Sequence, residues 1–148
     1  MVAYLEIQVS QIPFLLPMEN IQEVLYIAAS LVVPVTAMPS SVLGLLSHHS
    51  RIYWTLDLGK VLGLSPLVHL PKYAVTILNM GEEIMAIASE EINSIHQISE
   101  PIQALPADTL PHLIPYLDGY IHSWMVLNPQ SILKSLISNY DSVTNLAN

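Results

Sequence analysis

Residues 42–64, VLGLLSHHSRIYWTLDLGKVLGL, are the stretch from which the fold of this chain is best inferred. Two apolar runs stand on either side of a polar break, Ser47–Ser50, an arrangement that is typical of a β-hairpin. Asp57 follows the second run and can cap one helical turn, which Gly63 can end by taking a positive φ. The order strand, turn, strand, one-turn helix is uncommon and therefore informative.

This order resembles the CheW-like adaptors of bacterial chemosensory arrays. Their hairpin runs from a Gly through Asn-Leu-Arg-Gly and a Pro-containing apolar strand to an Asp-Leu pair, and residues 44–64 follow it without a gap. Residues 14–25 look like the family's opening motif, with a Leu-Pro step and a Glu-Val pair. Residues 81–95 and 124–133 resemble its later strands and final helix, so the resemblance covers roughly residues 5–137.

The chain departs from the family pattern at several positions and is thus a diverged member. His49-Ser50 stands where the family carries Arg-Gly in the hairpin turn, and Trp54 replaces a Pro. Ser89 and Asn128 occupy positions where the family often has Asp. The fold therefore transfers more safely than the identity of the partner.

The resemblance implies an all-β fold made of two packed small five-stranded β-barrels and a short C-terminal α-helix. It further implies one CheW-like domain over residues 1–140, built of two barrel subdomains, followed by a frayed tail at 141–148. At 148 residues the chain has the length of a single domain with a real core.

The residue pattern supports β structure independently. Residues 4–9 alternate apolar and polar side chains, as a half-buried strand does, and residues 14–16 can pair with them. Residues 73–78 and 83–88 also predict strands. Residues 18–27 carry apolar spacing that suits a helix, but we favour a short turn or helix that leads into an extended segment.

The clearest helix is predicted over residues 128–137. Asn128 is a good N-cap, and Pro129 suits the first helical position because its missing N–H would be unpaired there anyway. One apolar stripe then contains Ile132, Leu133, Leu136 and Ile137, and we expect it to pack on a barrel.

The composition is unusually apolar. Hydrophobic residues make up 52% of the chain, charged residues only 11%, and the mean hydropathy is +0.49. Such a chain is not disordered, because disordered chains are poor in apolar residues and rich in charge. The apolar excess either fills two small cores or stays exposed and meets a partner.

A membrane span over residues 24–50 is the rival interpretation, since this stretch carries no charge. Pro34 and Pro39 interrupt it, and its flanks lack the Lys/Arg excess that orients a span. The first charged side chain is Glu6, so we also expect no secretory signal, which would start with a basic segment. We therefore expect no membrane insertion, and the resemblance implies a cytoplasmic protein that is recruited to membrane-bound receptor arrays.

Charge and cysteine content exclude several functions. Four Lys and Arg against twelve Asp and Glu give a formal charge of −8, and so few cations cannot neutralise a nucleic-acid backbone. Cys is absent, which excludes disulfides, thiolate catalysis and zinc–thiolate sites.

Nothing in the sequence predicts catalysis. A Gly-x-Ser-x-Gly elbow and a glycine-rich phosphate loop are both missing from the sequence. His48 and His49 are adjacent in a predicted turn, so we expect their side chains to diverge rather than to share a metal. The other four histidines stand singly among apolar residues: His69, His96, His112 and His122. We thus expect no enzyme activity, cofactor or metal.

The resemblance implies a scaffold that joins a membrane chemoreceptor to a histidine autokinase through binding alone. It places Glu23 and His49 close together near the binding faces, and since His pairs with a carboxylate only when protonated, we expect a weaker, pH-dependent pair. The other candidate contacts are apolar, although each could instead be buried in the core: Val24, Leu25, Val42, Leu43 and Trp54.

Two alternatives stay open. The same fold could serve as a dimerising or otherwise degenerate interaction module with a different partner, including a second copy of itself. A metal or small-molecule sensor that uses His48 and His49 is the alternative from another class, and titration with zinc or nickel would distinguish it.

Overall fold

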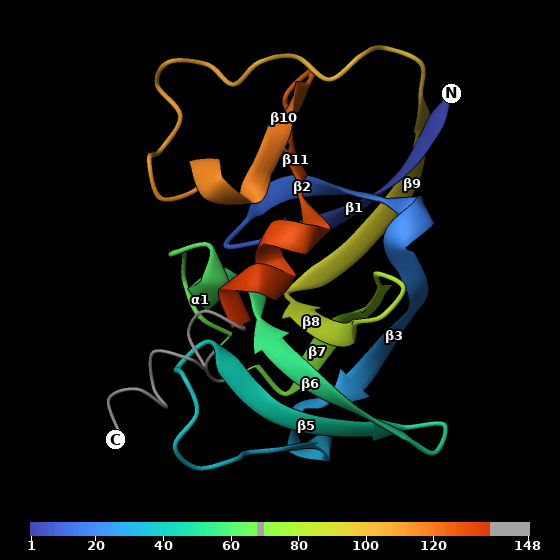
Figure 1. The fold of residues 1–148 in the computed structure, drawn as a ribbon, viewed down its shortest axis with the longest axis vertical. Coiled ribbons are helices and arrows are strands. Elements are labelled where there is room, and N and C mark those ends of the chain that lie inside the picture. Colours follow the sequence, from blue (N-terminus) through green and yellow to red (C-terminus); the bar gives the residue numbers. More distant parts are fainter. Residues whose placement is uncertain (68–69, 137–148) are drawn as a thin grey trace.

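The structure is a computed structural model that describes residues 1–67 and 70–136. It contains two β-sheets, one above the other in Figure 1. His69, Ile137 and the tail predicted at 141–148 lie outside the described residues.

The first sheet has five strands in the order β10-β11-β2-β1-β9. Its strands are β1 (Val2–Val9), β2 (Ile12–Pro17), β9 (Glu91–Ile98), β10 (Leu117–Ile121) and β11 (Trp124–Leu127). β1 pairs antiparallel with both β2 and β9, whereas β11 runs parallel to β2.

The second sheet has six strands in the order β3-β7-β8-β6-β5-β4. Its strands are β3 (Ile21–Ala28), β4 (Val32–Val33), β5 (Val42–His48), β6 (Arg51–Asp57), β7 (Lys72–Asn79) and β8 (Ile84–Ser89). One strand more than the predicted five is present because the two-residue β4 pairs with β5 at the sheet edge.

The all-β fold class is confirmed, and so are the segments predicted from the residue pattern. A 3₁₀ turn, η1 (Met18–Asn20), leads into β3, as predicted for this part of the chain. Two further 3₁₀ turns, η2 (Ala29–Leu31) and η3 (Ile114–Tyr116), precede β4 and β10. No helix among residues 1–67 and 70–136 is both long and apolar enough to cross a membrane.

The hairpin and the helical turn after it form as predicted. His49 and Ser50 connect β5 to β6 with φ of 49° and 64°, as in the two-residue turns whose twist suits a hairpin. Helix α1 (Leu58–Val61) begins after Asp57, which accepts a hydrogen bond from the Lys60 N–H at 3.3 Å. Gly63 follows the turn with a φ of +69°.

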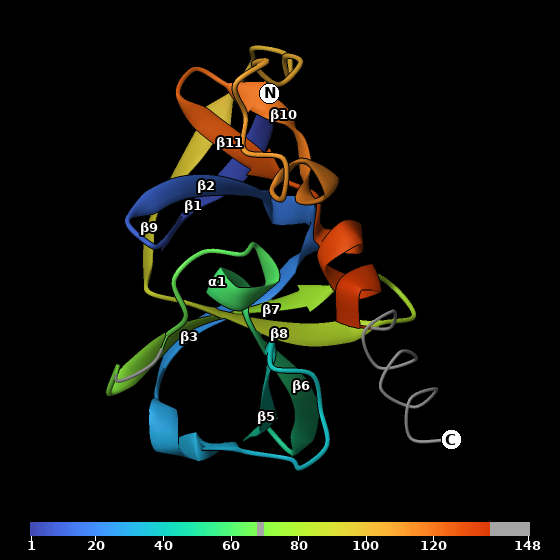
Figure 2. The same ribbon diagram turned by 90° about the vertical axis from the view of Figure 1, so that its left-hand side faces the viewer.

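The C-terminal helix covers residues 129–136 of the described chain. Asn128 caps it as predicted, because its Oδ1 accepts a hydrogen bond from the Ser131 N–H at 3.0 Å. Ile132 and Leu133 are buried in the core between the sheets. Figure 2 shows this helix beside the lower sheet and α1 between the two sheets.

The apolar side chains form three clusters. A small cluster fills the first sheet around Leu15 and Val126, and another fills the second sheet around Leu46 and Val75. The largest, which we call the shared core, draws from both sheets, from α1 and from the C-terminal helix. It includes Ile7, Phe14, Leu56, Leu62, Met85 and Ile132. The two sheets are therefore joined by buried apolar surface.

Candidate functional site

Glu23 of β3 and the β5–β6 hairpin meet although they come from distant positions in the second sheet. The Glu23 Oε1 atom lies 3.1 Å from the His48 Nε2 atom and 3.9 Å from the His49 Nε2 atom. β3 is the first strand in the sheet order and β5 is the fifth, so this contact requires the sheet to curl into an incomplete barrel.

A β-bulge directs the β3 side chains toward the hairpin. The β3–β7 register shifts between Ile21 and Glu23, which leaves Gln22 as an extra residue, and such an insertion can re-aim a side chain. Gln22 donates a hydrogen bond to the Tyr53 hydroxyl of β6 at 3.5 Å, next to the Glu23–His48 contact along β3. Two adjacent residues of β3 thus reach across the open side of the barrel.

The two histidines do not diverge as the sequence predicted. Their ring centroids lie 4.0 Å apart with the planes at 71°, and one ligand atom from each ring and from Glu23 lie within 4.8 Å of one another. The expectation was wrong because the positive φ at His49 turns its side chain back toward the face that His48 occupies. The predicted partner of Glu23 was His49, yet His48 is the nearer of the two.

The predicted apolar contacts differ in their exposure. Val24 points outward and is 42% exposed. Leu25 and Leu43 are half-buried and pack on the cluster inside the second sheet, whereas Val42 is half-buried against the shared core.

Trp54 lies half-buried on the outer face of the hairpin. It pairs with Leu45 across the strands, and Ile52 stands on the same face of β6 as Trp54. Sequence reasoning missed Ile52, which is 70% exposed. Strand alternation could have predicted its exposure. Tyr53 and Thr55 face inward, so Ile52 and Trp54 face outward.

The remaining described histidines have other surroundings. The His96 Nε2 atom of β9 lies 2.7 Å from the Glu6 Oε1 atom of β1. The His96 ring also packs at a tilt against Trp124, with the ring centroids 4.6 Å apart. These contacts fit the structural role that the sequence predicted for this residue. His122 is in the turn between β10 and β11, and its Nε2 atom lies 3.6 Å from the Glu100 Oε1 atom.

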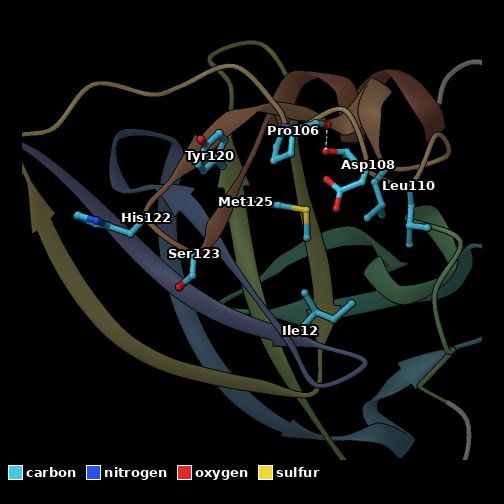
Figure 3. A pocket seen from close by; sticks show the side chains of 10 residues that line it. Ile12, Pro106, Asp108, Leu110, Tyr120, His122, Ser123 and Met125 are labelled. Atoms are coloured by element: carbon cyan, nitrogen blue, oxygen red, sulfur yellow. Dashed lines mark hydrogen bonds between the residues drawn. The ribbon is translucent and has the colours of Figure 1, made fainter.

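A pocket of about 340 Å³ lies beside the first sheet (Figure 3). Ile12 and Met125 line it from the sheet, and Pro106, Asp108 and Leu110 line it from the segment that leads to β10. Most of its lining is apolar carbon, and it lies away from the Glu23–His48 contact, so we assign it no role in the site.

Comparison with known proteins agrees with this architecture. The family model described as CheW-like domain matches residues 3–136. This match spans nearly all of the chain. The chain belongs to the CheW-like domain family.

Among solved structures, the CheW-like domain described here is similar to the scaffolding protein TtCheW from Thermoanaerobacter tengcongensis. The TM-score is 0.71 at 12% sequence identity, and the alignment covers 85% of this chain and 86% of that one. At this identity the likeness shows a shared fold. A search of curated protein sequences finds no significant match.

Proposed function

We propose that this CheW-like domain is a non-catalytic adaptor that joins a membrane chemoreceptor to a histidine autokinase in a chemotaxis- or motility-type signalling system. The observation that carries the proposal is the family match over residues 3–136. The similar structure from Thermoanaerobacter tengcongensis is described as a scaffolding protein, which supports the same role. The adaptor would act through binding energy alone, by holding two partners so that receptor signals alter kinase activity.

The outer surface of the second sheet offers contacts suited to such a role. Val24, Ile52 and Trp54 present apolar surface on the strands that the Glu23–His48 contact brings together. Trp is enriched among the residues that dominate binding energy, and a half-buried Trp can gain further burial in a complex. We therefore propose that Val24, Ile52 and Trp54 bind a partner protein.

The other predicted contacts would act differently. Leu25, Val42 and Leu43 pack on core clusters, so we propose that they mainly support the contact strands from behind. Glu23 and His49 would set the position of the hairpin tip relative to β3. With the receptor in a membrane, the adaptor would be recruited from the cytoplasm to receptor arrays.

The test is recovery of partners from cells that express the tagged protein with Val24→Arg, compared with the wild type. Arg at this exposed position places a charge in the proposed contact without disturbing the core. Ile95→Arg is the matched control, since Ile95 is also an exposed apolar residue on a strand, but on β9 of the other sheet.

We expect the wild type and the Ile95→Arg variant to recover a histidine kinase and a chemoreceptor, and Val24→Arg to lose at least one of them. Recovery of both partners by Val24→Arg would show that the proposed face is wrong. Recovery of neither by the folded wild type would refute the adaptor role itself. Circular dichroism establishes that each variant is folded.

A further inference from the structure

Glu23, His48 and His49 form the one group of three potential metal ligands that we find among residues 1–67 and 70–136. Each residue contributes one ligand atom, and these atoms lie within 4.8 Å of one another. Two imidazoles with one carboxylate are a ligand set that zinc accepts in proteins, usually with water in the fourth position.

The two separations that involve Glu23 suit a tetrahedral ion. Ligand atoms at the usual zinc bond lengths of about 2.0–2.1 Å stand about 3.3 Å apart in a tetrahedron. The distances from Glu23 Oε1 to the two Nε2 atoms, 3.1 Å and 3.9 Å, bracket this value. A small rotation of the exposed His49 side chain would bring its Nε2 atom closer to this separation.

The backbone favours the convergence of the three side chains. The β3 bulge aims Glu23 at the hairpin, and the turn with positive φ at His49 brings the second imidazole to the same face. The His49 side chain is 76% exposed, whereas that of His48 is 22% exposed. The cluster is thus held on its inner side and open to solvent on its outer side, where a water ligand needs access.

The charges near the cluster have opposing effects. Arg51 pairs with His48 across the hairpin and therefore stands on the same face, where its charge opposes a bound cation. The Glu23 carboxylate offsets that charge directly, and the formal charge of −8 on the whole chain attracts cations.

We propose that Glu23, His48 and His49 bind a divalent transition-metal ion of the zinc type, with water as the remaining ligand. Such an ion would connect β3 to the β5–β6 hairpin and close the open side of the second barrel. The proposal is independent of the adaptor function, because it concerns binding by the isolated protein. Imidazole and carboxylate ligands together favour zinc over magnesium or calcium, which prefer oxygen ligands alone.

The test is calorimetric titration of the full chain with zinc, with magnesium as the comparison ion. His48→Gln and His49→Asn each remove one imidazole, and Asn tolerates the positive φ at position 49. The matched control is His122→Asn, since His122 also has a positive φ, of 55°, and also lies near a glutamate.

We expect the wild type and His122→Asn to bind one equivalent of zinc with affinities that agree within about twofold, and no magnesium. His48→Gln and His49→Asn should each weaken zinc binding more than about tenfold, since even residues that only support a metal ligand contribute about 10- to 100-fold. A wild type that takes up no zinc at about 1 mM, or two variants that both keep wild-type affinity, would overturn the proposal.

A second readout uses thermal unfolding, because a substitution can change the heat of binding without changing the affinity for zinc. An ion that binds only the folded state raises the melting temperature as its concentration rises above the dissociation constant. Zinc should raise the melting temperature of the wild type and of His122→Asn, but not that of Glu23→Gln. A zinc-induced rise of equal size in Glu23→Gln would exclude Glu23 from the site.

Discussion

Asp57 joins two structural roles in one buried side chain. Its Oδ1 accepts a hydrogen bond from the Lys60 N–H, which caps α1, and its Oδ2 accepts one from the Leu67 N–H at 2.9 Å. The first contact was predicted from the sequence, since Asp at the end of a strand before a helical turn is a common cap. The second joins residues ten positions apart and could not be predicted from local pattern.

We expect Asp57→Ala to lower the free energy of unfolding by about 3 kcal/mol. Loss of an N-cap costs about 1 kcal/mol, and a buried N–H left without a partner costs about 1–3 kcal/mol more. Urea denaturation measures the change. Asp108→Ala, at an exposed position, should stay within about 0.5 kcal/mol of the wild type. A loss below about 1 kcal/mol in Asp57→Ala would mean that water replaces both contacts.

The histidine cluster shows where local reasoning about residues fails. His48 and His49 are adjacent in a predicted turn, and from this adjacency we expected their side chains to diverge. His49 has a positive φ in that turn, however, and the two rings lie close together. The proximity of Glu23 and the hairpin was implied by family resemblance alone, because β3 and β5 are brought together by the curl of the whole sheet.

At the scale of elements, strands with alternating or continuous apolar residues were predictable, whereas a strand with irregular spacing was not. β1 follows the period of two, and its bounds differ from the prediction by only two residues at the start. β9 places its isoleucines at positions 92, 95 and 98, three residues apart, and so gave no strand signal of its own. A bulge in β9 accommodates that irregular spacing, because Asn93 and Ser94 together stand opposite the single residue Glu6 of β1.

The edge of the second sheet depends on a close approach at Gly44. β4 has only two residues, and a Cβ atom at Gly44 would lie 2.0 Å from the Val33 carbonyl oxygen. Gly44 also has a φ of +145°, which side chains disfavour. No larger residue can therefore occupy this position without displacing β4.

We predict that Gly44→Ala destabilises the protein by about 3 kcal/mol or more, from backbone strain and overpacking together. Gly81→Ala is the matched control, because Gly81 has a φ of +92° but a Cβ atom there would meet nothing within 4 Å. It should cost only about 1 kcal/mol from the positive φ. Chemical denaturation of both variants measures the difference, and equal losses would show that the approach to Val33 does not matter.

At the scale of the whole molecule, the shared core decides whether the two sheets are independent. Residues from both sheets, α1 and the C-terminal helix are buried together in one cluster, and the clusters inside each sheet are smaller. Neither sheet can unfold without exposing the apolar surface that it contributes to the shared core. The resemblance implied two subdomains, and because of this packing we expect them to unfold as one cooperative unit.

The chain has two tryptophans, and each reports on a different sheet. Trp54 belongs to β6 of the second sheet and Trp124 to β11 of the first, so Trp54→Phe and Trp124→Phe each leave one probe. We expect the two probes to give coincident urea transitions, as two-state unfolding requires. Comparison of each variant's fluorescence transition with its own circular dichroism transition separates cooperativity from any change in stability that the substitution itself causes.

Leu62→Ala then tests the shared core as the reason for cooperativity. Leu62 is fully buried in that cluster, and its truncation should cost about 2–5 kcal/mol. Because the cluster belongs to both sheets, the midpoints reported by Trp54 and by Trp124 should fall together. A fall at one probe alone would show that the sheets unfold separately, and that the apolar contacts between them contribute little to the stability of one of them.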